Sequence, residues 1–182
     1  MATGTALRGT TSAEPAEVVA AAHELGVHGW VRPTGELHAE GAPDALDAFT
    51  QRIEATGAPV RVEGHEQFAL RGVPAGPFVV RERPRGYTLH FDGRTWALPK
   101  APSMNPADKR FATETETGDE TGAVWDEGTY ERGGRVGWPE AFQRGHAVFV
   151  LHGAKLEGGF ALQRTRPGAW LLIKRREGGA GR

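Results

Sequence analysis

A short segment rich in proline and glycine, residues 73–77 (VPAGP), divides the chain into two parts with different sequence patterns. Before it, amphipathic helical stretches alternate with short strands. After it, short runs of alternating apolar and polar residues follow one another closely, separated by turn residues. The first pattern is typical of a mixed α+β domain and the second of an antiparallel sheet that closes into a barrel or sandwich. We therefore expect two domains in the 182 residues, at 1–72 and 73–182.

The near-neutral charge of the chain, −1, hides a difference between its two parts. Residues 1–72 carry 5 Arg and 10 Asp or Glu, a net charge of −5, whereas residues 73–182 carry 17 Lys or Arg and 13 Asp or Glu, a net charge of +4. The second part is thus the better candidate for binding a phosphate-bearing partner. The chain has no cysteine, which excludes disulfides and thiolate metal sites. Any metal would need His, Asp or Glu ligands.

Targeting signals are not apparent in the sequence. No apolar run reaches the roughly 18 residues of a membrane-spanning helix. The first residues also lack the basic start and apolar core of a signal peptide. We expect a cytoplasmic protein with no membrane partner, and we leave its oligomeric state open.

The first part has the pattern of a split βαβ fold. Helices are predicted at 14–25 and 43–56, where apolar residues such as Val18, Ala22, Leu46 and Phe49 share one face. Strands are predicted around 5–8 and at 27–32, 36–40, 59–63 and 67–71. The order is β-α-β-β-α-β with one further short strand, which is a ferredoxin-like arrangement.

The strings HELGVHGWVR, GELHAEG and DALDAFTQRIEATGAPVRVEG make residues 16–71 resemble an acylphosphatase. That family binds phosphate with a glycine-rich loop that carries an arginine, and with an asparagine directly after the GWVR strand. Here the loop reads RGTTSAEPAE and the asparagine position is Pro33, which has neither a side-chain donor nor a backbone N–H. We expect a structural or docking module without acylphosphatase activity.

The second part is predicted to be a small antiparallel β-barrel. Strands are expected at 78–82, 87–91, 94–99, 122–131, 146–153, 158–165 and 169–175, with a short helix at 139–143. The strings TWALPKAPSMNPADKRFA, VWDEGTYE, GHAVFVLHGAKLEGGFALQRTR and AWLLIKRR make residues 78–176 resemble the 3′-phosphoesterase domain of bacterial end-joining DNA ligases. The resemblance implies a barrel with a manganese centre that removes a 3′ ribonucleotide or 3′-phosphate from DNA ends. It also implies phosphate contacts from Lys100 and Arg110. The alternative is that these two residues are surface charges, or partners of Asp108 and of the acidic run 114–120.

The metal ligands of that family are mostly missing. In one interpretation, His90 and Asp92 of LHFD match a family LHYD string and keep a manganese pair. In the other, which we favour, Asp92-Gly93 is itself the hairpin turn, the ligand positions fall near Gly86 and Thr88, and His90 takes a family arginine position. Residues 112–123, where the family has a further histidine and a tyrosine, contain neither. We therefore expect no cofactor, with manganese at His90 and Asp92 as the alternative.

The other histidines are expected to be structural. His23, His28, His38 and His65 lie in the first part, and none is predicted to pair with another ligand at metal spacing. His146 and His152 lie within strings that carry the family likeness. The best candidate site is instead a basic cluster that the barrel hairpin can bring to one face: Arg83, Arg85, His90, Arg94, Lys100 and Arg110.

The leading hypothesis is a degenerate 3′-phosphoesterase-like protein that binds phosphate-bearing nucleic-acid ends in DNA repair. A phosphate would be held by Lys100, Arg110, Arg94 and Arg83, with His90 and Tyr87 as candidates for acid–base chemistry. An alternative is a metal-independent enzyme of specialised metabolism that uses the barrel mouth as a small-molecule pocket. A purely structural partner protein is the third hypothesis. Whether any catalysis remains is open.

Overall fold

The computed structural model describes residues 4–116 and 120–177. Internal contacts divide the chain into two compact units, one formed by Met1–Val73 with Arg135–Gly137 and the other by Pro74–Gly134 with Trp138–Arg182. Within the described ranges, no helix is both long and apolar enough to cross a membrane.

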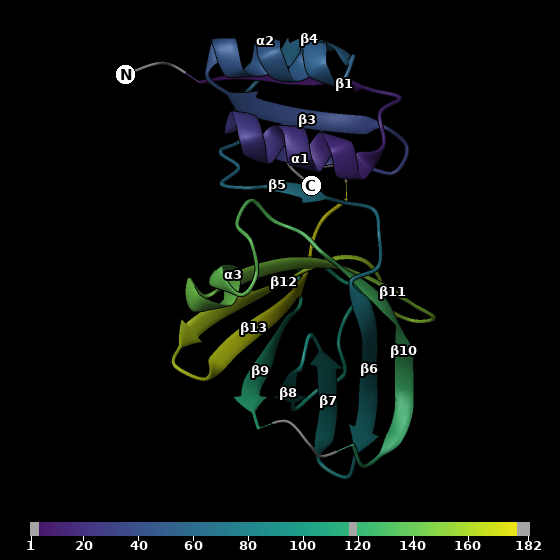
Figure 1. Ribbon diagram of the computed structural model, residues 1–182. Coiled ribbons are helices and arrows are strands. Elements are labelled where there is room, and N and C mark those ends of the chain that lie inside the picture. Colours follow the sequence, from purple (N-terminus) through teal and green to yellow (C-terminus); the bar gives the residue numbers. More distant parts are fainter. Residues whose placement is uncertain (1–3, 117–119, 178–182) are drawn as a thin grey trace. The chain divides into compact units, whose positions relative to one another are not determined.

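The first unit is a five-stranded sheet with two helices on one face (Figure 1). Its sheet order is β4-β1-β3-β2-β5, in which β2 and β5 are parallel and the other neighbours antiparallel. The helices bury the expected apolar residues, among them Val18, Ala22, Leu46 and Phe49. The elements are β1 (Thr5–Thr10), α1 (Pro15–Leu25), β2 (His28–Val31), β3 (Glu36–Gly41), α2 (Pro43–Arg52), β4 (Thr56–Val60) and β5 (Phe68–Leu70).

Two boundaries of the first unit differ from the prediction. Helix α2 ends at Arg52 rather than at residue 56, since Glu54 has a left-handed backbone with φ of 48°. Strand β4 therefore begins at Thr56, three residues early, although its sequence TGAPV contains a glycine and a proline. It lies at the edge of the sheet, where a proline is tolerated. There Gly57 lies opposite Gly9, and a Cβ on Gly9 would overlap the carbonyl oxygen of Thr56.

The second unit is a closed antiparallel barrel of eight strands (Figure 1). The strand order around it is β10-β11-β12-β13-β9-β8-β7-β6. A short helix, α3 (Glu140–Gln143), precedes β11. The strands are β6 (Gly76–Arg83), β7 (Gly86–Phe91), β8 (Arg94–Leu98), β9 (Lys109–Thr115), β10 (Ala123–Arg132), β11 (His146–Gly153), β12 (Glu157–Arg166) and β13 (Ala169–Lys174).

Strand β9 was not predicted. Its sequence KRFATET has two apolar positions, and Phe111 is 71% exposed while Ala112 is buried, so the alternation is weak. The strand forms because β8 and β13 pair with its two edges, and strand formation depends strongly on such neighbours.

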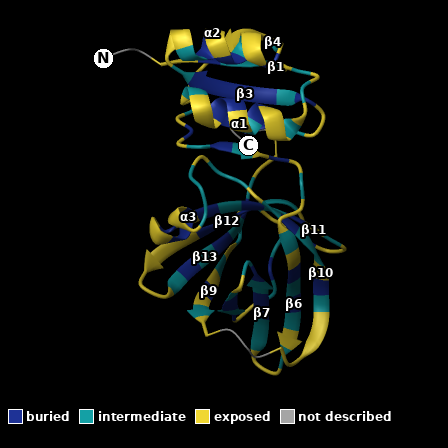
Figure 2. Cartoon of the chain, viewed as in Figure 1, coloured by how far each residue is buried: buried dark blue, intermediate teal, exposed yellow. Residues whose placement is uncertain are grey.

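Aromatic rings fill the barrel. Phe91 contacts Trp96, Tyr130 and Phe149 at ring-centroid distances of 5.1, 5.2 and 4.6 Å, and Phe149 also stacks on Phe160 at 6.2 Å. Buried and more exposed positions alternate along the barrel strands, as Figure 2 shows. Burial of these rings contributes most of the hydrophobic stabilisation of the barrel.

His152 forms an exposed polar cluster across three barrel strands. Its Nε2 is hydrogen-bonded to the carboxylate of Glu131 on β10, and its Nδ1 lies 3.0 Å from Oε1 of Glu157 on β12. The hydrogen bond with Glu131 and that with Glu157 raise the pKa of His152, against a smaller opposing effect of burial. His152 therefore has a structural role, because it links β10, β11 and β12 through these contacts.

Replacing Phe149 by alanine should destabilise the barrel by about 3–5 kcal/mol, because it removes a fully buried ring and leaves a cavity. Urea unfolding followed by tryptophan fluorescence measures this change. Phe111→Ala is the matched control, since that ring is 71% exposed and its removal should change the free energy of unfolding by less than about 0.5 kcal/mol. Equal effects of the two substitutions would contradict the described core.

The His152 cluster should stabilise the fold only at low pH. Because the pKa is raised in the folded state, the stabilisation is complete below the unfolded-state pKa of about 6.5 and is lost as pH rises through the folded-state pKa. His152→Asn should therefore cost a few tenths to about 1 kcal/mol near pH 5.5, since the side chain is half-exposed, and almost nothing near pH 9. Urea unfolding at both pH values measures the cost, and a cost that grows with pH would contradict the assignment.

Candidate functional site

A two-residue turn between β7 and β8 sets the geometry of the candidate site. Asp92 and Gly93 have positive φ values of 53° and 68°, and Phe91 pairs directly with Arg94. Asp-Gly is the sequence that such a tight hairpin turn favours. The prediction that Asp92-Gly93 is itself the turn is confirmed.

The tight turn decides which side chains enter the core. Leu89 and Phe91 of β7 and Trp96 of β8 belong to the buried core. Because neighbouring side chains of a strand point to opposite faces, Thr88 and His90 lie on the other face. Thr95 and Ala97 of β8 lie on this face too. In β9, Thr115 pairs with Thr95 and Thr113 pairs with Ala97, so both share it. Three strands thus present a face rich in threonine hydroxyls.

A pocket of about 630 Å³ opens over this face. Thr88 and Thr95 in its wall are only 9% and 6% exposed, and Arg83 and Arg85 reach it from the turn between β6 and β7. Glu116 is the acidic residue of its lining. The described residues that line it are Arg83, Pro84, Arg85, Tyr87, Thr88, Thr95, Ala97, Leu98, Pro99, Thr113, Thr115 and Glu116.

Two residues considered for acid–base chemistry lie at or beside the pocket. Tyr87 lines it and packs edge-on against Trp125, with ring centroids 5.7 Å apart. His90 is not part of the lining, but Thr95 is. Nδ1 of His90 lies 2.7 Å from Oγ1 of Thr95. His90 can therefore orient the Thr95 hydroxyl.

The predicted basic cluster is not brought together as one group. Arg83 and Arg85 lie at one end of β7, whereas Arg94 lies at the other, and the six residues of β7 span roughly 20 Å. Arg94 forms an ion pair with Glu114 at 3.1 Å and lies over the ring of Phe142.

Arg110 and Lys100 also lie outside the lining of the pocket. Arg110 donates from Nε to the carbonyl oxygen of Ala101 at 2.9 Å and pairs with Asp108 at 3.3 Å. Lys100 is exposed and follows the lining residue Pro99. Of the predicted phosphate-binding residues, Arg83 is the one in the pocket, and Arg85 joins it there.

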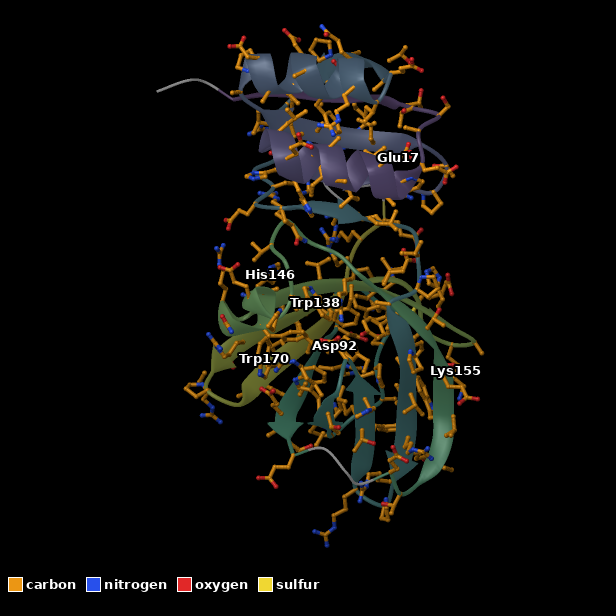
Figure 3. The ribbon with its side chains drawn as sticks, viewed as in Figure 1. Glu17, Asp92, Trp138, His146, Lys155 and Trp170 are labelled. Atoms are coloured by element: carbon orange, nitrogen blue, oxygen red, sulfur yellow. The ribbon has the colours of Figure 1, made fainter. Side chains whose placement is uncertain are left out.

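Asp92 is held by other side chains. Its Oδ1 accepts hydrogen bonds from the hydroxyl of Tyr130 and from Nη2 of Arg132, both at 2.8 Å. Figure 3 labels Asp92 at this turn, with Trp138 nearby, and Arg132 lies over the Trp138 ring. Burial and the interaction with Asp92 raise the pKa of Tyr130. Oδ1 of Asp92 is thus held by two donors from β10.

A group of metal-ligating side chains was missed in the first unit. His38 and Glu40 of β3 meet Glu63 and His65 from the segment after β4, and their donor atoms all lie within 4.8 Å of one another. The expectation that neither His38 nor His65 pairs with another ligand is therefore wrong. The signal was the two strings HAE and EGH, each of which spaces a histidine and a glutamate two residues apart.

Comparisons with known proteins support the resemblance of the second part. No family model matches the chain. Over 116 residues the chain is 32% identical to the multifunctional non-homologous end joining protein LigD of Pseudomonas aeruginosa, a match that covers 52% of this chain and 14% of that protein. The chain thus spans a small part of that relative.

A solved acylphosphatase from Coxiella burnetii is 24% identical, with a TM-score of 0.33, and the match covers 37% of this chain and 93% of that one. The resemblance to an end-joining protein therefore has a counterpart among known proteins. The likeness to the acylphosphatase is weak.

Proposed function

We propose that the barrel unit binds phosphate-bearing nucleic-acid ends in DNA repair and does so without a metal centre. The observation that carries this proposal is the pocket in which Arg83 and Arg85 meet a wall of threonine hydroxyls. The similarity to an end-joining protein supports the choice of a nucleic-acid end as the ligand.

The chemistry of the pocket fits a terminal phosphate. A guanidinium group donates two parallel hydrogen bonds to phosphate oxygens and stays charged at all relevant pH values. Thr88 and Thr95 add hydroxyl donors that are already held in place by burial. The volume of about 630 Å³ lies within the range of small-ligand pockets, which suits the last nucleotide of a strand.

We propose no metal chemistry because of the residues that occupy the positions of the family's metal ligands. The resemblance to the phosphoesterase family puts ligands near Gly86 and Thr88, and neither is a good ligand for manganese. Asp92 is engaged with Tyr130 and Arg132. His90 then acts as a positioning residue for Thr95, and the barrel binds the end of a strand as a degenerate relative of the phosphoesterase domains.

The first unit has a supporting role in this proposal. It is an acylphosphatase-like domain in which Pro33 occupies the position of the family asparagine. Without an amide there, the unit has lost the group that would orient water. We assign it to docking rather than to hydrolysis.

A fluorescently labelled DNA duplex with a 3′-phosphate should bind the full chain more tightly than the same duplex with a 3′-hydroxyl. The double variant Arg83→Ala/Arg85→Ala should weaken binding of the phosphorylated end about 10- to 100-fold. Each charged hydrogen bond is worth about 1.5–3 kcal/mol, and the contributions of two neighbouring residues do not add fully. Fluorescence anisotropy at several salt concentrations measures these affinities, which should fall with rising salt.

Arg166→Ala is the matched control, since Arg166 is an exposed arginine of β12 outside the pocket. It should leave the preference for the 3′-phosphate unchanged. Equal binding of both ends by the wild-type chain would contradict the proposal, as would an Arg166→Ala effect as large as that of the double variant. A strict requirement for added manganese would contradict its metal-free form.

A further inference from the structure

A polar row is buried on the sheet face of the first unit that the helices do not cover. In β3, Leu37 and Ala39 face the helical core, so His38 and Glu40 point to the opposite face. Both are nevertheless buried, at 0% and 5% exposure, and Figure 2 shows β3 buried along most of its length. Glu63 and His65 cover them from the segment that follows β4.

The four side chains contact one another in two pairs. Nε2 of His38 lies 2.8 Å from Oε1 of Glu40, and Nε2 of His65 lies 3.1 Å from Oε2 of Glu63. The two imidazole rings are 5.3 Å apart between centroids. Each of two chain segments therefore contributes one imidazole nitrogen and one carboxylate oxygen, and these four atoms all lie within 4.8 Å of one another.

The backbone holds this geometry in place. Glu40 accepts hydrogen bonds from the N–H groups of Glu63 at 2.5 Å, Gly64 at 3.0 Å and His65 at 2.9 Å. Arg8 forms an ion pair with Glu63 at 3.0 Å. The side chains thus meet in an organised and largely dry setting, where exposure ranges from 0% for His38 to 16% for the Glu63 side chain.

The hydrogen bonds among these residues leave one ring nitrogen of His38 without a partner among the described residues. The Nδ1 atom of His38 is buried and has no hydrogen-bond partner among the described residues. Buried polar atoms are seldom unpaired. The contact with Glu40 through Nε2 therefore satisfies only one of the two ring nitrogens of His38.

We propose that His38, Glu40, Glu63 and His65 form a binding site for a divalent transition metal of the zinc type. Two imidazole nitrogens and two carboxylate oxygens are a donor set that Zn²⁺ accepts, whereas Ca²⁺ and Mg²⁺ prefer oxygen alone. Tetrahedral zinc with bonds of about 2.0–2.2 Å separates its ligand atoms by roughly 3.4 Å, so donors that lie within 4.8 Å of one another need shifts of about 1 Å.

The proposed site is structural. Four protein ligands complete a tetrahedral zinc site and leave no position for substrate. Bound metal would join β3 to the segment after β4, in which the apolar side chain of Val62 is 42% exposed. The site is independent of the pocket in the barrel, and its test does not depend on nucleic-acid binding.

Metal content and affinity test the proposal directly. The full chain, stripped with a chelator and titrated with ZnCl₂ in a calorimeter, should take up one equivalent, and its thermal midpoint should rise with metal. Cobalt in the same site should show the strong visible bands of a tetrahedral complex. His65→Asn and Glu63→Gln should each weaken zinc binding at least about tenfold.

A second histidine with two glutamates provides the matched control. His152 contacts Glu131 and Glu157 on the barrel surface, so His152→Asn should leave zinc uptake unchanged. If His65→Asn does not fold, Glu63→Gln still decides, because its amide has nearly the same shape and Glu63 is the most accessible ligand. No stoichiometric uptake, or uptake abolished by His152→Asn and kept by Glu63→Gln, would overturn the proposal.

Discussion

The pairing of β9 with both β8 and β13 is the interaction on which the barrel depends. These ladders join Ala97 to Thr113 on one side and Ala112 to Trp170 on the other, and they close a sheet that would otherwise have two free edges. Closure turns one face of every strand toward a core of aromatic rings. The same pairing places the threonines of β9 beside Thr95 and Ala97 of β8, so the wall of the pocket follows directly from it.

The short β7–β8 hairpin has an equally direct effect on the pocket wall. The two-residue turn at Asp92-Gly93 fixes the register of β7 against β8. With this register, Phe91 lies in the core and His90 lies on the threonine face. Asp92 is thereby removed from that face and is held by Tyr130 and Arg132. The same hairpin therefore fixes the surroundings of both His90 and Asp92.

Local sequence patterns predicted much of this fold, and contacts between distant segments explain what they missed. The apolar stripe of α2 and the Asp-Gly turn are local signals, and both are confirmed. Strands β4 and β9 have weak local patterns and form because neighbouring strands pair with them. The meeting of His38 with His65 and the ion pair of Arg94 with Glu114 likewise depend on tertiary contacts, whereas Arg110 pairs with Asp108, only two residues away. Arg83, the last residue of β6, lines the pocket because it lies directly before the turn between β6 and β7.

The central claim is that the threonine-lined pocket receives the phosphate of a nucleic-acid end. Backbone amide NMR of the full chain during titration with a short 3′-phosphorylated DNA duplex tests it residue by residue. We expect the largest chemical-shift changes at Arg83, Arg85, Thr88 and Thr95, and no comparable changes with the 3′-hydroxyl duplex. Shifts that are the same for both duplexes, or that leave these four amides unmoved, would contradict the account.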